Sequence, residues 1–465
     1  MQKLAVILLI SLVLVVPVRT RTLVDGNTPA PVKTILENGT TVILIEDHSA
    51  PVISCQVYSR LGTGDELFDA QGSAFLAAYA NVPGASQYNT DGGIVLDGGD
   101  EARSIISRDF VGLLLRGSMD KFDSMIERAS KFATISQVRT EFPTLKKIAT
   151  MRESTNLVPD ETLRTVAINQ IYNTAFRDQH ARSFWNDEEG VTSLNETALA
   201  EFVSRAGSPD NLVVVIAGDF EPDYVNIVVK RWFGHRHAEK IPGDQAARVP
   251  TVKVTSGMRE NTTGPGANVQ NPLKRLDIKL PTRDEALSIG YKFQIDNSDL
   301  ASLKLLGIIL GGEKSSRLQI RFMDRASHDY RANVVDASLE AAKASGGNSL
   351  FSIYLEEPPS PFYSIWQSET FISDEITKLK QSAIDEQELT TAKRFLTAQY
   401  REQNDTIDGR AFVIARGFLS TGDLSGADDA MRAMLAVTAA DIRRVANKYL
   451  VDDNRTAVTI VPVRR

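Results

Sequence analysis

Two stretches of the chain, 243 residues apart, share one pattern. The first is LNETALAEFVSRAGSPDNLVVVIAG, from Leu194, and the second is VTAADIRRVANKYLVDDNRTAVTIV, from Val437. Each predicts an N-cap residue (Asn195 or Thr438), an amphipathic helix, an Asp-Asn turn and a strand of β-branched residues. Because such self-similarity indicates a repeated structural unit, the sequence predicts two related domains.

The elements before each repeat also resemble one another. KTILENGTTVILIEDHSAPVISCQVYSR predicts strand, Asn38-Gly39 turn, strand, turn and strand, and a helix is expected over 72–81. In the second half, EALSIGYKFQID predicts a strand. NSDLASLKLLGIILGG predicts a helix that is capped by Asn297 or Ser298 and ends before Gly311. The mixture of strands and helices predicts an α+β class.

Length and composition support two domains. A chain of 465 residues is too long for one ordinary core. The segment VTSGMRENTTGPGANVQNP is rich in Gly, Asn, Thr and Pro, as linkers are. We expect domains at 30–240 and 273–465, joined by a linker at 241–272.

The amino terminus, MQKLAVILLISLVLVVPVRT, predicts an export signal over 1–20. Lys3 precedes an apolar run over 4–18, which is short for a membrane span, and cleavage is expected near Thr20. An uncleaved membrane tether is the alternative. The single cysteine, Cys55, is expected to be a packed core thiol, and a cysteine-poor exported chain fits a bacterial periplasm. We therefore expect a periplasmic or secreted protein.

The net charge argues against nucleic acid as a partner. The formal charge is −7 and the isoelectric point is near 5.5, so the chain has no global basic field to attract phosphate backbones. Phosphate-binding glycine loops with the required spacing are missing, and so is a Gly-x-Ser-x-Gly elbow.

Two segments resemble the M16 peptidases, the pitrilysin or insulinase family, and in particular its short two-domain branch with mitochondrial processing peptidase. LENGTTVILIEDHSAPVISCQVYSRLGTGDE is similar to the opening hairpin of that family and its Gly-Ser-x-x-Glu turn. LGGEKSSRLQIRFMDRASHDYRANV, from Leu310, is similar to its Gly-Gly-x-x-Ser-Ser-Arg-Leu segment. The resemblance implies two homologous LuxS/MPP-like α/β sandwich domains with mainly antiparallel sheets.

The zinc motif of the family is missing from the first helix. Active members carry His-x-x-Glu-His there, because two imidazoles four residues apart reach one Zn²⁺ and the Glu activates the bound water. In this chain Ala74, Ala77 and Ala78 stand at those positions, or Phe75, Ala78 and Tyr79 if the alignment has no gap. Neither alignment leaves a zinc ligand.

The remaining donors do not replace the motif. The distal ligand of the family falls on Met151 in TMRESTNLVPDE, where Glu153 is a lone carboxylate nearby. FGHRHAEK offers His235 and His237, which we expect to be solvated rather than a metal site. We expect no metal or other cofactor in this chain.

The resemblance implies a function for a chain without zinc. Two-domain M16 proteins form a closed chamber from two subunits, of which one can hold the zinc. The expectation is a non-catalytic subunit of a heterodimeric M16 zinc peptidase that forms half of the chamber and helps to bind peptide, with zinc in the partner subunit. Tyr330 stands at the family's substrate-binding tyrosine, and Arg321 and Arg325 flank Met323 at its arginine position. Solvated or locally paired arginines and a buried strand tyrosine are the alternatives for these three.

Two other functions remain open at this stage. The chain can be a pseudo-peptidase scaffold or peptide-holding module with no role in proteolysis. It can also be a hydrolase with an unrecognised site, although no constellation in the sequence fills the usual catalytic roles.

Overall fold

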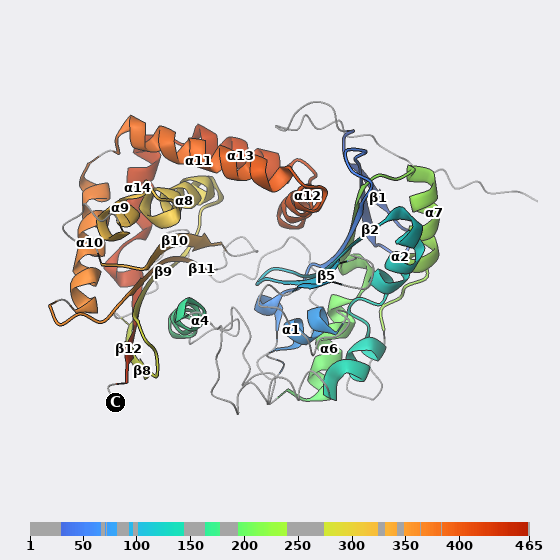
Figure 1. Cartoon of the computed structure of the whole chain (residues 1–465), viewed down its shortest axis with the longest axis horizontal. Coiled ribbons are helices and arrows are strands. Elements are labelled where there is room, and N and C mark those ends of the chain that lie inside the picture. The colour runs from blue at the N-terminus through green and yellow to red at the C-terminus, as the bar shows by residue number, and fades with distance from the viewer. Residues whose placement is uncertain are drawn as a thin grey trace, which may run out of the picture.

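The computed structural model describes residues 29–66, 70, 72–80, 93–95, 101–143, 163–176, 194–239, 274–323, 331–341, 348–362, 364–382 and 384–463. In these residues the chain forms two β-sheets, both flanked by helices (Figure 1). The predicted α+β class is confirmed. The signal expected at 1–20 and the linker expected at 241–272 lie outside the described residues.

The first sheet contains seven strands, which are β1 (Val32–Ile35), β2 (Thr41–Glu46), β3 (Ile53–Ser59), β4 (Gly93–Val95), β5 (Glu101–Ile106), β6 (Val111–Gly117) and β7 (Leu212–Gly218). Their order is β1-β2-β7-β3-β6-β5-β4. All neighbours are antiparallel except β2 and β7, which are parallel. The predicted Asn38-Gly39 turn joins β1 to β2, and Gly39 has a φ of +98°, a conformation that favours glycine.

The second sheet contains five strands, which are β8 (Lys274–Leu280), β9 (Glu285–Gln294), β10 (Val334–Glu340), β11 (Asn348–Glu357) and β12 (Arg455–Pro462). Their order is β10-β11-β9-β12-β8, with only β8 and β12 parallel. In the reverse order, β8-β12-β9-β11-β10, the strands of this sheet have the same connectivity as β2-β7-β3-β6-β5 of the first sheet. The two sheets are therefore versions of one plan, with mainly antiparallel strands as expected.

The repeat read from the sequence is present in the structure. Helices α6 (Glu196–Ala206) and α14 (Ala439–Tyr449) begin and end 243 residues apart, and β7 and β12 begin 243 residues apart. The predicted caps are confirmed: the side chains of Asn195 and Thr438 accept hydrogen bonds from the N–H groups of Ala198 and Asp441.

One face of each sheet is covered by helices of its own half. On the first sheet these are α1 (Ser73–Tyr79), α2 (Phe122–Ser130), α6 and α7 (Pro222–Phe233). On the second they are α8 (Leu300–Gly307), α9 (Arg317–Met323), α10 (Ile365–Gln381), α11 (Glu386–Asn404), α13 (Gly426–Ala436) and α14. Burial of the apolar faces between these layers is the main source of stability for both halves.

The other face of each sheet is covered by a helix from the opposite half (Figure 1). Helix α4 (Leu163–Ala175) precedes the second sheet in sequence but packs on its strands β8, β9, β11 and β12. Helix α12 (Ile407–Thr421) follows nearly all of the second sheet but packs on β3 and β7 of the first. The two halves are interlocked by this reciprocal exchange.

One helix boundary differs from the sequence prediction. Asn297 and Ser298 do not cap α8, because they lie in a 3-10 turn over 297–299 that precedes it. Gly311 does not follow the helix end, because a π-helical turn over 308–312 continues α8. The Cβ that an alanine would add at Gly311 would lie 2.7 Å from the backbone nitrogen of Ala337, so the glycine permits close packing on β10.

Cys55 is fully buried in β3, which confirms the core thiol, and burial raises its pKa to about 12.

Among the helices of the described ranges, none has both the length and the apolar character needed to cross a membrane.

Candidate functional site

Helix α1, on which active M16 peptidases carry the zinc motif, begins at a capped and buried turn. Gly72 precedes it with a φ of +87°. The buried carboxylate of Glu66 accepts hydrogen bonds from the N–H groups of Gly72 (3.2 Å) and Ala74 (2.7 Å). A carboxylate at this end satisfies free N–H groups and complements the helix dipole. The N-terminus of this short helix is thus fixed by hydrogen bonds.

The three motif positions on α1 are part of the hydrophobic core. Ala74, Ala77 and Ala78 are each 0% exposed and belong to the apolar cluster of the first half. Phe75, which the ungapped alignment places in the motif, packs against the same cluster. Methyl groups and a phenyl ring have no lone pair for a metal, so these residues do not fit zinc.

The other expected positions give no metal centre. Met151, and Glu153 beside it, lie outside the described residues, as does the side chain of Tyr79. Across the described ranges, no group of three or more His, Cys, Asp or Glu residues is arranged to hold a metal ion.

His235 and His237 are both exposed, as expected, and the half-buried Arg236 separates them. Arg236 donates hydrogen bonds to four backbone carbonyls, those of Ser130, Phe132, Ala133 and Gly207. Burial lowers its pKa to about 10. This loop therefore fastens α7 to α2 and α6.

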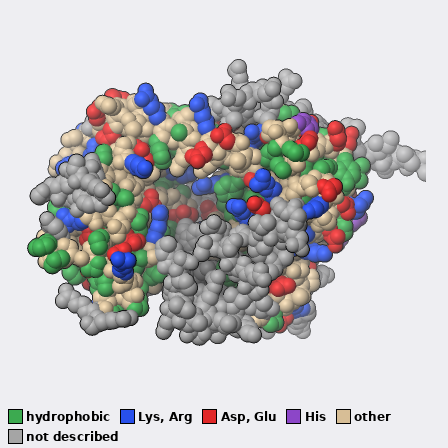
Figure 2. Space-filling view, in the orientation of Figure 1, with side chains coloured by type: hydrophobic (Ala, Val, Ile, Leu, Met, Phe, Trp, Pro, Cys, Tyr) green, Lys and Arg blue, Asp and Glu red, His purple; other side chains and the backbone are tan. Residues whose placement is uncertain are grey.

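A charged cluster that the sequence analysis missed lies where the two halves meet. We call Arg108, Asp109, Lys304, Glu340 and Arg416 the interface cluster. They come from the β5–β6 turn, α8, the end of β10 and α12, which surround the middle of the molecule in Figure 1. Figure 2 shows a hollow there, with basic and acidic side chains inside it. Their wide spacing in the sequence leaves no local motif to detect.

Aromatic rings at the C-terminal end of α4, those of Tyr172 and of Phe176 directly after the helix, form one wall of the interface cluster. The guanidinium of Arg108 lies 5.1 Å from the ring centre of Phe176 and 5.8 Å from that of Tyr172, and the two rings stack. On β9, Nζ of Lys292 lies 4.9 Å from the Phe176 ring and donates to the carbonyl of Ala175 at 3.0 Å. Phe176 is thus held by cations from both halves.

Burial and like charges shift the titration of two cluster members. Burial, followed by the charge of Asp109, raises the pKa of Glu340 to about 7. Burial, followed by the charge of Arg416, lowers the pKa of Lys304. Strongly perturbed groups in a hollow are candidates for function.

Comparison with known proteins connects this geometry to a family. A model of the peptidase M16 inactive domain matches residues 193–396. The zinc protease PqqE of Helicobacter pylori is 23% identical over 438 residues, which cover 92% of this chain and 92% of that protein. The chain is similar to the M16 peptidases.

Solved structures agree on the M16 fold. A protease from Helicobacter pylori has a TM-score of 0.72 at 19% identity, covering 94% of this chain and 100% of that one. A peptidase M16 inactive domain from Pseudomonas fluorescens has a TM-score of 0.72 at 15% identity, covering 94% of this chain and 98% of that one. The M16 resemblance and the two-sheet architecture that it implied are confirmed.

The substrate-binding residues expected from the M16 resemblance are only partly described. Tyr330 and Arg325 lie outside the described residues. Arg321, on α9, pairs with Glu375 of α10 at 2.8 Å and donates to the carbonyl of Phe371 at 3.2 Å. Its guanidinium also lies 4.5 Å from the Phe371 ring centre. The role of all three residues in binding substrate stays a prediction.

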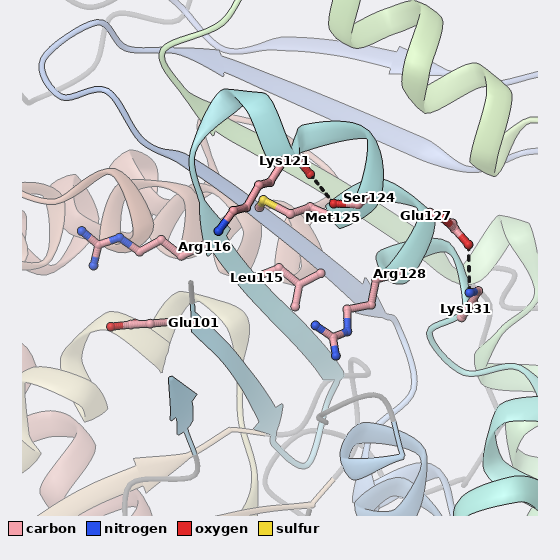
Figure 3. Close-up of a pocket in the computed structure, with 9 residues that line it drawn as sticks. All are labelled: Glu101, Leu115, Arg116, Lys121, Ser124, Met125, Glu127, Arg128 and Lys131. Carbon is pink, nitrogen blue, oxygen red and sulfur yellow. Dashed lines mark hydrogen bonds and ion pairs between the residues drawn. The ribbon is translucent and has the colours of Figure 1, made fainter. Parts of the chain in front are cut away.

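This M16-like chain also has a pocket of about 300 Å³ between the first sheet and α2 (Figure 3). Its lining residues are Glu101, Leu115, Arg116, Lys121, Ser124, Met125, Glu127, Arg128 and Lys131. Glu127 pairs with Lys131 at 3.0 Å, and Arg116 lies 3.6 Å from Asp408 of α12. Because much of its charge is already paired, we regard the interface cluster as the stronger candidate.

Proposed function

We propose that this M16-like chain is the non-catalytic subunit of a heterodimeric zinc peptidase. In this role it forms half of the closed chamber and helps to bind the peptide substrate, while a partner subunit holds the zinc. The observation that carries the proposal is the burial of Ala74, Ala77 and Ala78 in the core of the first half.

The chemistry of zinc explains why this observation weighs against catalysis by the chain itself. A catalytic zinc needs three protein ligands and one open position for water. The motif face of α1 supplies only apolar atoms and is closed to solvent. A peptidase built on this fold therefore needs its metal from another chain.

The surface between the halves supports a role in holding peptide. The interface cluster combines cations and carboxyl groups with the aromatic wall of Tyr172 and Phe176. Guanidinium groups donate to carbonyls and carboxylates, and aromatic rings give apolar contact, which are the two kinds of interaction that a peptide needs. Export to the periplasm or the exterior, with the signal over 1–20 removed, is part of the proposal.

A peptide-holding scaffold with no role in proteolysis is the second candidate. The observation in its favour is the ion pair between Arg321 and Glu375. A guanidinium that is already bound within its own helical layer is less free to orient a substrate for cleavage.

Purification of the chain with its native partners tests the proposal. The complex should contain a second M16 subunit with an intact His-x-x-Glu-His, hold zinc in that subunit and cleave peptides. The chain alone should do none of these. A complex that binds peptides without cleaving them supports the scaffold, and tightly bound zinc in the isolated chain contradicts both functions.

A further inference from the structure

We infer that the hollow between the halves contains an anion-binding centre, in which Arg108, Lys304 and Arg416 bind a carboxylate of the peptide. The inference rests on the proposed peptide-holding function and adds a chemical class to its ligand. The carboxylate can belong to an acidic side chain or to the carboxyl terminus.

Two of the three cations form no direct ion pair. Within the described part of the chain, neither Lys304 nor Arg416 forms an ion pair within 4.0 Å or a side-chain hydrogen bond. Their charges also oppose each other, since Arg416 disfavours the charged form of Lys304. The carboxyl groups of Glu340 and Asp109 favour the charged form of Lys304 without forming a direct ion pair with it. Two neighbouring cations that are not held in a direct ion pair favour the binding of an external anion.

Two other cations that join the halves do form direct ion pairs. Arg410 of α12 pairs at 2.5 Å with Asp47, which directly follows β2, and Arg164 of α4 pairs with Asp336 of β10. These two ion pairs help to attach each exchanged helix to the sheet of the opposite half. Within the described residues, Lys304 and Arg416 have no ion pair of this kind.

Arg108 supplies a donor that lacks an acceptor. Its Nη1 atom is buried and has no hydrogen-bond partner, although its guanidinium lies over the rings of Phe176 and Tyr172. A buried donor without an acceptor is costly. A bound carboxylate oxygen would satisfy it, and the stacked rings already orient the guanidinium plane.

The carboxyl groups of the cluster do not neutralise all of its cations, so the net charge suits one anionic ligand. Asp109 and Glu340 face three cations, and Glu340 is only partly ionised near pH 7 because burial and Asp109 raise its pKa. Tyr172 also faces Glu340, but its pKa lies well above 10, again mainly through burial, so it stays neutral. The balance of about one to two positive charges suits a single carboxylate rather than a polyanion.

The titration of Glu340 gives the centre a pH signature. As the pH falls from 8 to 6, Glu340 becomes neutral and the field at Lys304 and Arg416 becomes more positive. A peptide carboxylate stays ionised over this range. Carboxylate binding should therefore strengthen at the lower pH.

Three otherwise identical peptides test the inference on the full-length chain. The first has one internal Glu and an amidated carboxyl terminus, the second has a free carboxyl terminus and no acidic side chain, and the third is neutral and amidated. Fluorescence anisotropy at pH 6 and pH 8 should show roughly tenfold tighter binding of the first or second peptide than of the third. Whichever peptide is preferred identifies the source of the carboxylate.

Variants link this preference to the cluster. Arg416→Gln and Lys304→Met should each remove most of the preference, because each lowers the affinity for the acidic peptide far more than the affinity for the neutral peptide. Arg401→Gln, at an exposed arginine of α11, is the matched control. Glu340→Gln should give the same affinity at pH 6 and pH 8, whereas Glu402→Gln, at an exposed glutamate, should keep the difference.

The outcomes separate this inference from the proposed function. Equal binding of the three peptides would overturn the anion-binding centre and leave the peptide-holding role intact. A carboxylate preference that survives both Arg416→Gln and Lys304→Met would also overturn it. No binding of any peptide would remove the peptide-holding function and the inference together.

Discussion

The guanidinium of Arg410 on α12 pairs with the carboxylate of Asp47 at the end of β2, with 2.5 Å between Nη1 and Oδ2. Asp47 is only 2% exposed. Burial pushes its pKa upward, but hydrogen bonds from Ser49 and the charge of Arg410 hold it below its usual value. The pair fastens a helix of the second half to the sheet of the first.

Removing this pair should destabilise the chain. Arg410→Met leaves a buried carboxylate without its cation, so the free energy of unfolding should fall by about 3 kcal/mol. Urea denaturation measures the loss. Arg401→Met, at an exposed site, should change it by less than about 0.5 kcal/mol. A similar small change for Arg410→Met would mean that the pair is not what fastens α12.

The stability of the chain should depend on pH through Glu340. Its pKa is raised from 4.5 in the unfolded chain to about 7 in the folded one. The protonated carboxyl therefore contributes stability below about pH 4.5, and this contribution is lost as the pH rises through 7. Relative to Glu340→Gln, the wild-type chain should lose about 3 kcal/mol between pH 4.5 and pH 8. Parallel pH curves of the two proteins, from chemical denaturation, would contradict the assignment.

The motif face of α1 should not accept a restored zinc site. The combined change Ala74→His, Ala77→Glu and Ala78→His puts three large polar groups into a closed core, so the variant should unfold more easily by several kcal/mol. Elemental analysis should find no stoichiometric zinc in the wild type or in the variant. One tightly bound zinc in a stable variant would show that this face opens toward solvent.

Tyr330→Phe tests the substrate-binding role expected for that tyrosine. A residue that orients a peptide acts on turnover, so kcat/KM of the reconstituted heterodimer should fall roughly tenfold to a hundredfold. Zinc content and subunit association should stay normal. Unchanged kcat/KM across several peptides would leave this chain with the chamber-forming role alone.

Cleavage of the expected linker should not separate the halves. Limited proteolysis should cut first between Ser256 and Pro272, where the sequence is rich in Gly, Asn and Thr. The two fragments should then elute together in size-exclusion chromatography, because α4 and α12 each pack on the sheet of the other half. Elution as separate fragments would contradict the interlocked packing.

Local signals in the sequence were enough to predict much of the fold. The caps Asn195 and Thr438, the Asp-Asn turns and the β-branched strands predicted the repeated unit, because each signal acts over a few residues. The burial of Cys55 was also predicted, although every residue of β3 is buried rather than alternate ones. The cap of α8 was predicted wrongly, because Asn297 and Ser298 have capping side chains but the chain forms a 3-10 turn there.

Contacts between distant segments could not be predicted in this way. Helix α4 carries no local sign that it belongs on the second sheet rather than the first. Lys304 and Glu340 look like ordinary charges in the sequence, and only the fold brings them to Arg108. The positions of Ala74, Ala77 and Ala78 were predictable as the loss of a motif, whereas their complete burial required the structure.

The exchange of α4 and α12 has a consequence for how the protein is made. The first sheet is complete in sequence at Gly218. Among the described residues, the helix that covers the apolar face formed by Ile43, Val213 and Val215 is α12, which begins at Ile407. A nascent chain must therefore keep this face from aggregating while nearly 200 further residues are synthesised. Contacts that span most of the chain also slow folding. A chain truncated before Ile407 would expose a β-rich apolar surface, so we expect it to be cleared by proteases or to aggregate rather than to persist as a half-molecule.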